Sequence, residues 1–400
     1  MPTPIRFTAG ERPPTPINMN DQLRIIRAEN DLLFDEAGRS YIDLFSAHGT
    51  AWLGHAPHRV AAAVAAQLQA VWNIGGLGFP LFTRACELVD SFFPPSHGLC
   101  ALYSTGMEAA EFSIRFARVV TGRRGAIGFQ RSMHGKSLAT SILTWDNRDG
   151  MQVPDFIRLP FVGECGESAI LERLTAQLAK GTIGAVLVEP LQGSGGGHMA
   201  SPGFYRELQR LCTAQGALLI FDEILTGFFR TGTPFFFSEL GFVPDVVLIG
   251  KAVGSGFPVA GVVALRRHPV SEAMLRGSTF AGNPLACAAL VATLEEIGRR
   301  DLRALVAAIE QTIVAILGPL KDGGVAVRGK GALWVLELPS ATDTRALVKR
   351  IYLQGVCVGY TGRQIRVLPA AIIAPGRLAQ ACVTVRDAVN WACHDASATG

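Results

Sequence analysis

Short and almost continuous apolar runs recur through the middle of the chain, and they restrict its fold more than any other feature. Each run ends in a small or polar residue, and a stretch with helical periodicity follows it. The runs occupy residues 100–104, 125–129, 185–189, 217–223, 245–251 and 259–265. Strands of unbroken Val, Ile and Leu are typical of parallel sheets that helices cover on both faces. The pattern therefore predicts an α/β fold with a mostly parallel central sheet.

The chain is long enough for more than one domain, because 400 residues exceed the usual reach of one hydrophobic core. After about residue 290, a long helical stretch and further strand-like runs replace the alternating pattern. We expect an N-terminal arm and part of a small domain at 1–50, a large domain at 51–290 and a C-terminal α+β small domain at 291–400. The Pro-rich first 20 residues or so form the predicted arm.

Composition and charge argue against several classes of protein. The net charge of +4, without a basic run, is too weak a bias to suggest nucleic acid as a partner. The N-terminus lacks the apolar stretch of a signal peptide, and no run of about 18 apolar residues suggests a membrane span. The eight scattered cysteines have no metal-binding spacing and indicate free thiols in a reducing cytosol. We therefore expect a cytoplasmic protein without a metal site.

Lys251 is the first candidate for chemistry. It is the only one of six lysines that ends a strongly apolar run and opens a Gly-rich loop, GKAVGSGFP. An amine removed from water there has a lowered pKa and can attack a carbonyl group. The same position also suits a lysine that only marks the solvent end of a strand, and position alone does not separate the two.

Asp222 ends a second apolar run, ALLIFD, where a carboxylate is costly unless it meets a cation. A protonated pyridine nitrogen is one such cation, and a helix N-cap or a salt bridge is the structural alternative. Ile224, two residues later, would lie against a ring face. The turn at Thr105 and Gly106 opens a helix whose N–H groups suit a phosphate, and the loop GSTFAGNP offers a further hydroxyl, Thr279.

In this order the motifs resemble those of the class III (ornithine/GABA-type) pyridoxal-phosphate (PLP) aminotransferases, a branch of fold type I. The resemblance runs from about residue 35 to 375. The motifs that carry it are YIDLFS, LGHAPHRV, STGMEA, MHGKS, VEPLQGSGG, FDEILTGFFRTG, PDVVLIGKAVGSGFP, GSTFAGNPLA, VRGKGALW and IRVLPAAI. It implies a large domain with a mostly parallel sheet and a smaller α+β domain formed by the N- and C-terminal segments. It also implies PLP as the cofactor and a homodimer with composite active sites.

The resemblance also assigns roles to residues. Lys251 is the implied Schiff-base lysine, and Asp222 is the implied partner of the pyridine nitrogen. The other implied cofactor contacts are Thr105, Gly106, Met107, Met133, His134, Ile224 and Thr279, the last reaching the phosphate of the neighbouring subunit. Glu189 matches a glutamate behind the cofactor. Arg366 matches the arginine that grips a substrate carboxylate, for which a guanidinium fork is suited, although an ordinary strand-end arginine is the alternative.

Three residues depart from the family pattern. Met133 replaces the usual Tyr or Phe on the cofactor ring, and Met107 replaces a phosphate-binding Thr. Ser194 replaces a glutamate that pairs with the carboxylate-binding arginine, which argues against a plain ornithine or GABA aminotransferase. His48 lies where relatives often carry a pocket aromatic, and it either faces the substrate or is a structural histidine.

The leading functional hypothesis is ping-pong transamination through pyridoxamine phosphate, with Lys251 as general base and acid. The expected donor is glutamate or alanine, and the expected acceptor is a small aldehyde or keto compound. An aminomutase or amino-acid racemase on the same scaffold is the alternative, and it would need no second carbonyl substrate. A non-catalytic PLP-binding protein has no need for Lys251, Asp222 and Arg366 together. We expect side-chain specificity to come from loops near 45–52, 72–82 and 145–153.

Overall fold

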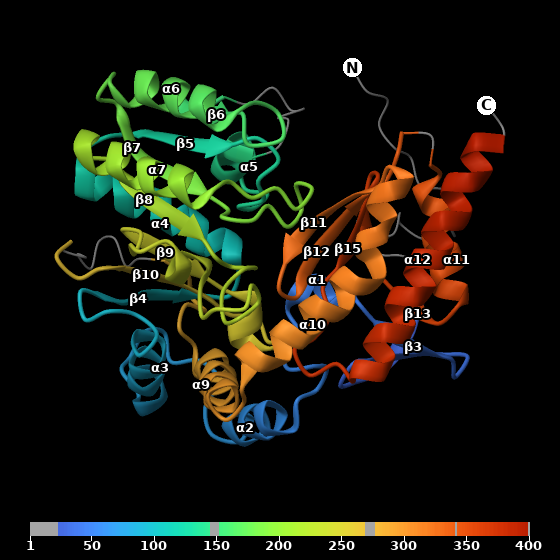
Figure 1. The fold of residues 1–400 in the computed structure, drawn as a ribbon. Helices are drawn as coiled ribbons and strands as arrows, with labels where there is room; N and C mark the ends of the chain where they lie inside the picture. The colour runs from blue at the N-terminus through green and yellow to red at the C-terminus, as the bar shows by residue number, and fades with distance from the viewer. Residues whose placement is uncertain (1–22, 145–151, 269–276, 341, 399–400) are drawn as a thin grey trace, which may run out of the picture.

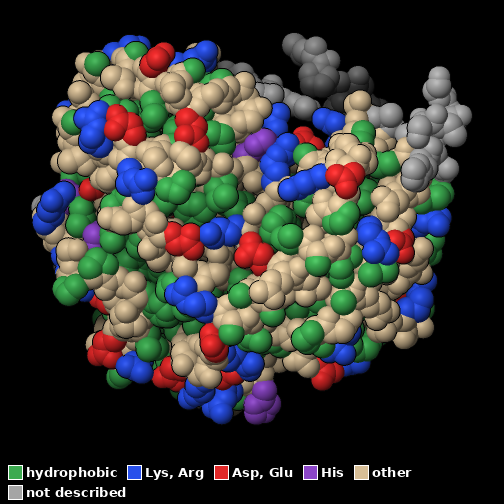
Figure 2. Space-filling view, viewed as in Figure 1, with side chains coloured by type: hydrophobic (Ala, Val, Ile, Leu, Met, Phe, Trp, Pro, Cys, Tyr) green, Lys and Arg blue, Asp and Glu red, His purple; other side chains and the backbone are tan. Residues whose placement is uncertain are grey.

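The computed structural model describes residues 23–144, 152–268, 277–340 and 342–398 (Figure 1). The predicted N-terminal arm and most of the predicted specificity loop at 145–153 lie outside these residues. The chain folds into a large α/β layer and a second body in which N-terminal and C-terminal segments lie together (Figure 1). On the face shown in Figure 2, acidic and basic side chains are interspersed.

A seven-stranded sheet forms the centre of the large part. Its strands stand in the spatial order β4-β10-β9-β8-β7-β5-β6. Their bounds are β4 (His97–Tyr103), β5 (Gly125–Phe129), β6 (Phe156–Leu159), β7 (Ile183–Val188), β8 (Leu218–Asp222), β9 (Val246–Ile249) and β10 (Ala260–Leu265). Strands β5 to β9 pair in parallel, whereas β10 runs antiparallel to both β4 and β9. The predicted mostly parallel sheet is therefore confirmed, with one reversed strand.

Helices bury both faces of this sheet, as the unbroken apolar runs predicted. On β8, Leu219 and Phe221 pack into one core cluster, whereas Leu218 and Ile220 pack into another on the opposite face. Helix α4 contacts the sheet on the second face, and α7 contacts β8 on the first. The helices of this part are α2 (His58–Leu68), α3 (Pro80–Asp90), α4 (Gly106–Thr121), α5 (Leu138–Thr144), α6 (Glu167–Leu178), α7 (Pro202–Gln215) and α9 (Pro284–Gly298).

The second body combines both ends of the chain, as the family resemblance implied. Strands β1 (Ile25–Glu29), β2 (Leu32–Asp35) and β3 (Ser40–Asp43) form a sheet with β13 (Val356–Cys357) from the C-terminal part. A second sheet has the order β11-β12-β15-β14, with β11 (Ala326–Lys330), β12 (Leu333–Glu337), β14 (Gly359–Thr361) and β15 (Gln364–Val367). Helices α10 (Leu302–Leu317), α11 (Thr344–Leu353) and α12 (Pro375–Ala398) pack beside them.

Of the residues that the structure describes, one helical stretch, Leu302–Gly323, is long and apolar enough by composition to cross a membrane, and 28% of its apolar window is buried. The stretch contains α10, which packs along α12. Its buried residues Val306, Ile309 and Ile313 recur at helical spacing and belong to the main core. A core helix passes the same test, so this stretch alone does not establish a membrane span.

Candidate active site

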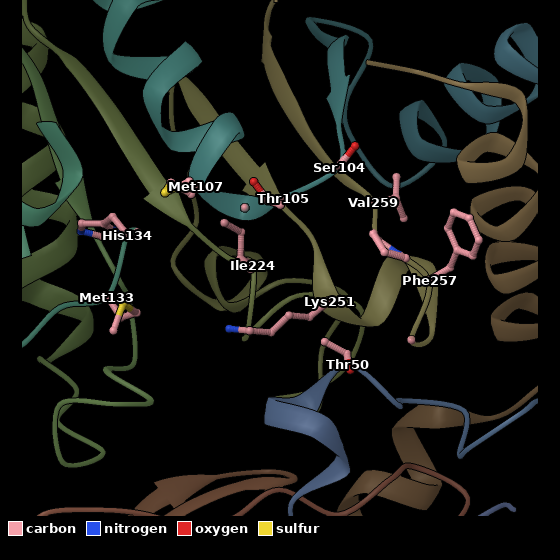
Figure 3. A pocket seen from close by; sticks show the side chains of 14 residues that line it. Thr50, Ser104, Thr105, Met107, Met133, His134, Ile224, Lys251, Phe257 and Val259 are labelled. Atoms are coloured by element: carbon pink, nitrogen blue, oxygen red, sulfur yellow. The ribbon is translucent and has the colours of Figure 1, made fainter. Parts of the chain in front are cut away.

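A cavity of about 350 Å³ opens where the parallel strands of the large sheet end (Figure 3). In α/β sheets, ligands bind beyond the carboxyl ends of the strands. The lining residues are Thr50, Ser104, Thr105, Gly106, Met107, Met133, His134, Gly135, Ile224, Lys251, Gly256, Phe257, Pro258 and Val259. Seven of the residues predicted from the sequence are among them, and they come from four different strand ends.

Lys251 follows β9 after one residue, Gly250, and begins the short helix η2 (Lys251–Gly254). Its side chain extends into the cavity, toward the side where Met133 lies (Figure 3). Burial lowers the pKa of its amine, although the carboxylates of Asp222 and Glu189 oppose this shift. Its backbone is left-handed, with φ 45°, a strained conformation for a residue other than glycine. The chain therefore holds a buried amine at this point by a constrained backbone.

Asp222 is the last residue of β8 and is 4% exposed. Its Oδ2 lies 2.7 Å from Nδ1 of His134, and its Oδ1 accepts a hydrogen bond of 3.1 Å from the Ile224 N–H. Both oxygens are thereby fixed in direction. The other ring nitrogen of His134, Nε2, is buried without a hydrogen-bond partner. Buried polar atoms are rarely left alone, so this end of the cavity suits a polar ligand.

The N-terminus of α4 borders the same cavity. Thr105 is its N-cap and forms a capping box with Glu108, whose carboxylate accepts from the Thr105 N–H at 2.9 Å. The N–H groups of Gly106 and Met107 belong to the first helical turn and have no acceptor four residues earlier. Gly106 also leaves room for Ile224, because a Cβ atom there would lie 2.7 Å from its Cδ1. Two backbone donors at a positive helix end are therefore available to an anion.

Glu189 follows β7 and is 6% exposed, but it does not line the cavity. Its Oε2 accepts a hydrogen bond of 2.9 Å from the Met133 N–H. Burial raises the pKa of Glu189 to about 7, with His134 lowering it and Asp222 raising it further. The glutamate thus holds the segment that carries Met133 and His134 against the sheet.

Arg366, on β15, is 7% exposed and lies outside the cavity lining. Its Nη1 lies 3.3 Å from Ser194 Oγ, its Nη2 lies 3.4 Å from His48 Nδ1, and its Nε has no partner. The predicted neighbour Ser194 is therefore in contact with the arginine. Burial lowers the pKa of Arg366, and Glu189 is the acidic group that opposes this.

Two of the predicted cofactor contacts, Asp222 and Thr279, are not among the residues that line the cavity, although Asp222 lies against the lining residue His134. Thr279 lies farther along the chain, in the loop before α9, and its carbonyl oxygen accepts a hydrogen bond of 3.0 Å from Asn73 Nδ2. Conversely, sequence reasoning missed Thr50, Ser104 and the segment 256–259, all of which line the cavity. The Gly-rich loop after Lys251 was the available signal for 256–259. Among the described residues, no group of three or more His, Cys, Asp or Glu side chains is placed to hold a metal ion.

Arg230 is a further residue that sequence reasoning did not single out. Its side chain is fully buried and donates to backbone oxygens of Gly49 and Pro369, both at 2.8 Å. It lies outside the cavity lining. It joins the loop after β8 to the N-terminal segment that carries His48 and to the segment after β15. The signal was an arginine within the apolar run GFFRTG.

Comparison with known proteins gives consistent results. The family model for class III aminotransferases matches residues 17–389. The acetylornithine aminotransferase of Methanopyrus kandleri is 30% identical over 92% of this chain and 94% of its own length. The 2-aminoadipate transaminase of Pseudomonas putida is 31% identical over 81% and 83%, and the 4-aminobutyrate aminotransferase of Escherichia coli is 32% identical over 86% and 87%.

Among solved structures, the ornithine aminotransferase of Toxoplasma gondii superposes with a TM-score of 0.86 over 95% of this chain and 92% of that chain. The two sequences are 24% identical, so this likeness shows the fold alone. That structure was described with partial occupancy of PLP at its active site.

Proposed function

The chain belongs to the class III aminotransferase family, and from this premise we propose which of its residues carry out the reaction. It is a PLP-dependent aminotransferase. The observation that carries the assignment of residues is the buried Lys251 amine in a cavity that is also lined by the N-terminus of α4 and by His134, whose Nδ1 lies 2.7 Å from Asp222 Oδ2. We assign this cavity to the cofactor and Lys251 to its covalent attachment.

The residues present fit PLP in three respects. The N–H groups of Gly106 and Met107 suit its phosphate, with Thr105 beside them. The Asp222 carboxylate, fixed by two hydrogen bonds, suits a protonated ring nitrogen. Ile224 and Met133 supply apolar surfaces for a planar ring. When bound, PLP supplies an electron sink for bond cleavage at the carbon that carries the substrate's amino group.

Lys251 then has a second task, which follows from its burial. Burial lowers the pKa of the Lys251 amine and favours its unprotonated form, which can accept a proton from the amine-bearing carbon of the substrate. The neighbouring Asp222 and Glu189 favour its protonated form and allow it to return that proton to the product. Glu189 acts through Met133 and His134, which it holds in place, and we assign it a positioning role.

We assign Arg366 to the carboxylate of the substrates. A buried guanidinium with a free Nε and two long hydrogen bonds retains its capacity for a bidentate carboxylate. The relatives are named for acetylornithine, 2-aminoadipate and 4-aminobutyrate, all of which are carboxylates. We propose glutamate or alanine as the amino donor and a small aldehyde or keto compound as the acceptor.

We further propose a cytoplasmic homodimer with composite active sites. Thr279 lies outside the cavity of its own chain, and its carbonyl accepts a hydrogen bond from Asn73. Trp72 and Phe280, which are next to Asn73 and Thr279 in the sequence, are 62% and 59% exposed. Exposed apolar side chains next to both partners of this hydrogen bond support an interface there, through which Thr279 of the partner subunit would reach the phosphate. All eight cysteines are free, which supports a reducing compartment. The domain boundaries 1–50, 51–290 and 291–400 are part of the same proposal.

The test is Lys251→Ala, compared with the exposed control Lys349→Ala on α11. Wild type and control should show visible absorption from covalently attached PLP and should convert it to the pyridoxamine form when amino donors are added. Lys251→Ala should lose both properties. Retained attachment and turnover in that variant would contradict the assignment. Turnover of wild type without any second carbonyl substrate would indicate an isomerase instead.

A further inference from the structure

The side-chain partners of Arg366 are uncharged. Among the ion pairs of the described residues, none includes Arg366, and its contacts are the Ser194 hydroxyl and the His48 ring. Arg366 is nevertheless only 7% exposed, and its Nε is buried without a hydrogen-bond partner. Burying a cation without a carboxylate partner is costly in free energy, so an anionic ligand that binds to Arg366 would be stabilised there.

His48 contacts this arginine with a defined ring nitrogen. Because a guanidinium only donates hydrogen bonds, Nδ1 of His48 must accept, which places the ring proton on Nε2 and leaves the ring neutral. The ring also stands edge-on to Phe45, with centroids 4.3 Å apart, and Phe45 lies 5.8 Å from the Arg366 guanidinium. Partial burial, together with the cations Arg366, Lys251 and Lys136, lowers the pKa of His48 to about 4.

An unusual backbone holds His48 in this place. Ser46, Ala47 and His48 have φ values of 46°, 48° and 61°, and Gly49 follows with 84°. Three successive left-handed residues other than glycine are strained. Such strain persists where the surroundings fix the chain, and it is concentrated at functional sites.

Both ends of this left-handed turn, residues 46–49, are anchored. At its start, Asp43 Oδ1 accepts hydrogen bonds from the N–H groups of Phe45 and Ser46, at 2.8 and 3.0 Å. At its end, the Gly49 carbonyl accepts from Arg230 Nη2 at 2.8 Å. The Leu44 carbonyl accepts from the Leu368 N–H at 2.7 Å, two residues beyond Arg366 on the chain. The turn is therefore fixed to the same segment that carries the arginine.

We propose that His48 is a positioning and specificity-determining residue, which holds Arg366 through a neutral hydrogen bond and leaves its charge open to substrate carboxylates. This inference rests on the proposed function. An arriving carboxylate can accept from the free Nε and from a second N–H of an Nη group, while the His48 hydrogen bond keeps the guanidinium in place and no acidic side chain competes for its charge. Arg366 is then open in both half-reactions, so the substrate class is a pair of carboxylates. The amino group passes from an amino acid to an oxo acid, and the carbonyl oxygen passes in the reverse direction.

The experiment measures binding of glutarate, a dicarboxylate without an amine, to the holoenzyme by calorimetry. The variants are His48→Asn, His48→Ala and His48→Asp, with His58→Asp as the control at an exposed histidine that begins α2. Asn and Asp tolerate the left-handed conformation, so these variants keep the turn. Thermal unfolding of each variant establishes that the fold is retained.

We expect His48→Asp to weaken glutarate binding by about 10- to 100-fold, because the introduced carboxylate competes with the ligand for the charge of the guanidinium. His48→Ala should weaken it by about 2- to 10-fold through loss of a neutral hydrogen bond, and His48→Asn should restore it. His58→Asp should leave it unchanged. Binding by His48→Asp equal to that of wild type, or binding by His48→Ala as tight as that of wild type, overturns the inference.

A second readout separates this inference from the proposed function. In half-reactions, the His48 variants should raise the KM for glutamate more than they lower kcat, and they should leave the rate with a simple amine such as butylamine unchanged. If wild type converts glutamate but the KM for glutamate is the same in wild type and in all His48 variants, the inference about His48 is wrong and the proposed function is not affected. If the variants bind glutarate with the expected differences in affinity but the enzyme converts no amino donor, the inference is supported and the proposed function is contradicted.

Discussion

Arg230 connects three separate parts of the chain, and its replacement tests whether the arrangement around the site depends on it. The side chain is fully buried. Its Nη1 donates to the carbonyl oxygens of Pro369 at 2.8 Å and Ala332 at 3.4 Å, and its Nη2 donates to Gly49 at 2.8 Å. The guanidinium lies 3.9 Å from the centre of the Trp52 ring. Burial lowers the pKa of Arg230 to about 9, so it keeps its charge at neutral pH.

The expected cost of Arg230→Met follows from these contacts. Each of the two short hydrogen bonds from a charged donor contributes about 1.5–3 kcal/mol, and a desolvated cation–π contact contributes about 2 kcal/mol. Against them stands the desolvation of the cation, which costs several kcal/mol. Methionine fills much of the volume but leaves the carbonyl groups without donors. We therefore expect a loss of about 3 kcal/mol in the free energy of unfolding.

Urea unfolding of the enzyme, followed by tryptophan fluorescence, measures this loss. Arg210→Met is the matched control, because Arg210 is 64% exposed on α7 and, among the described residues, its ion pair is with Glu207. The control should change the free energy of unfolding by no more than about 0.5 kcal/mol. If Arg230→Met is as stable as Arg210→Met, the hydrogen bonds of Arg230 do not outweigh the burial of its charge, and the reasoning is refuted.

Two further substitutions test the cofactor side of the site. Asp222→Asn should retain PLP, as judged by visible absorption. Its kcat should fall on the order of 10²- to 10³-fold, because a neutral amide does not stabilise a positive charge on the ring nitrogen. Unchanged kcat would contradict the role of Asp222. Glu189→Gln tests pH dependence. The folded pKa of Glu189 is raised from 4.5 to about 7, so its contribution to stability is present below pH 4.5 and is lost as the pH rises through 7. The stability of wild type relative to Glu189→Gln should therefore fall between pH 4.5 and 7 in urea titrations, and a constant difference would contradict the raised pKa.

Much of the fold could be predicted from the sequence, because strands buried on both faces leave an unbroken apolar signature. All six predicted runs overlap strands of the central sheet. The strand β6 was missed because Phe156–Leu159 is short, half-buried and at the sheet edge. The reversed direction of β10 was also not predicted, since an apolar run has the same pattern in either direction.

The candidate site was predictable where a polar residue ends an apolar run. Lys251 and Asp222 are of this kind, and the structure brings both to one end of the sheet. Their roles stay a proposal, as do those of the phosphate turn. Thr50 lines the cavity from a loop whose course depends on tertiary packing, and no local pattern singled out this residue.

The side-chain contacts of Arg366 could be predicted only in part from the family pattern. Ser194 indicated that the usual acidic partner is absent, but no sequence signal indicated that His48, 318 residues away, contacts the same guanidinium. A structural histidine does not require three successive left-handed residues, which cost about 3–6 kcal/mol in total. Since Arg230 anchors the end of this turn, its removal should also release His48 from Arg366. Stability and carboxylate recognition are thus linked through Gly49, and Arg230→Met should weaken glutarate binding under conditions where the enzyme is still folded.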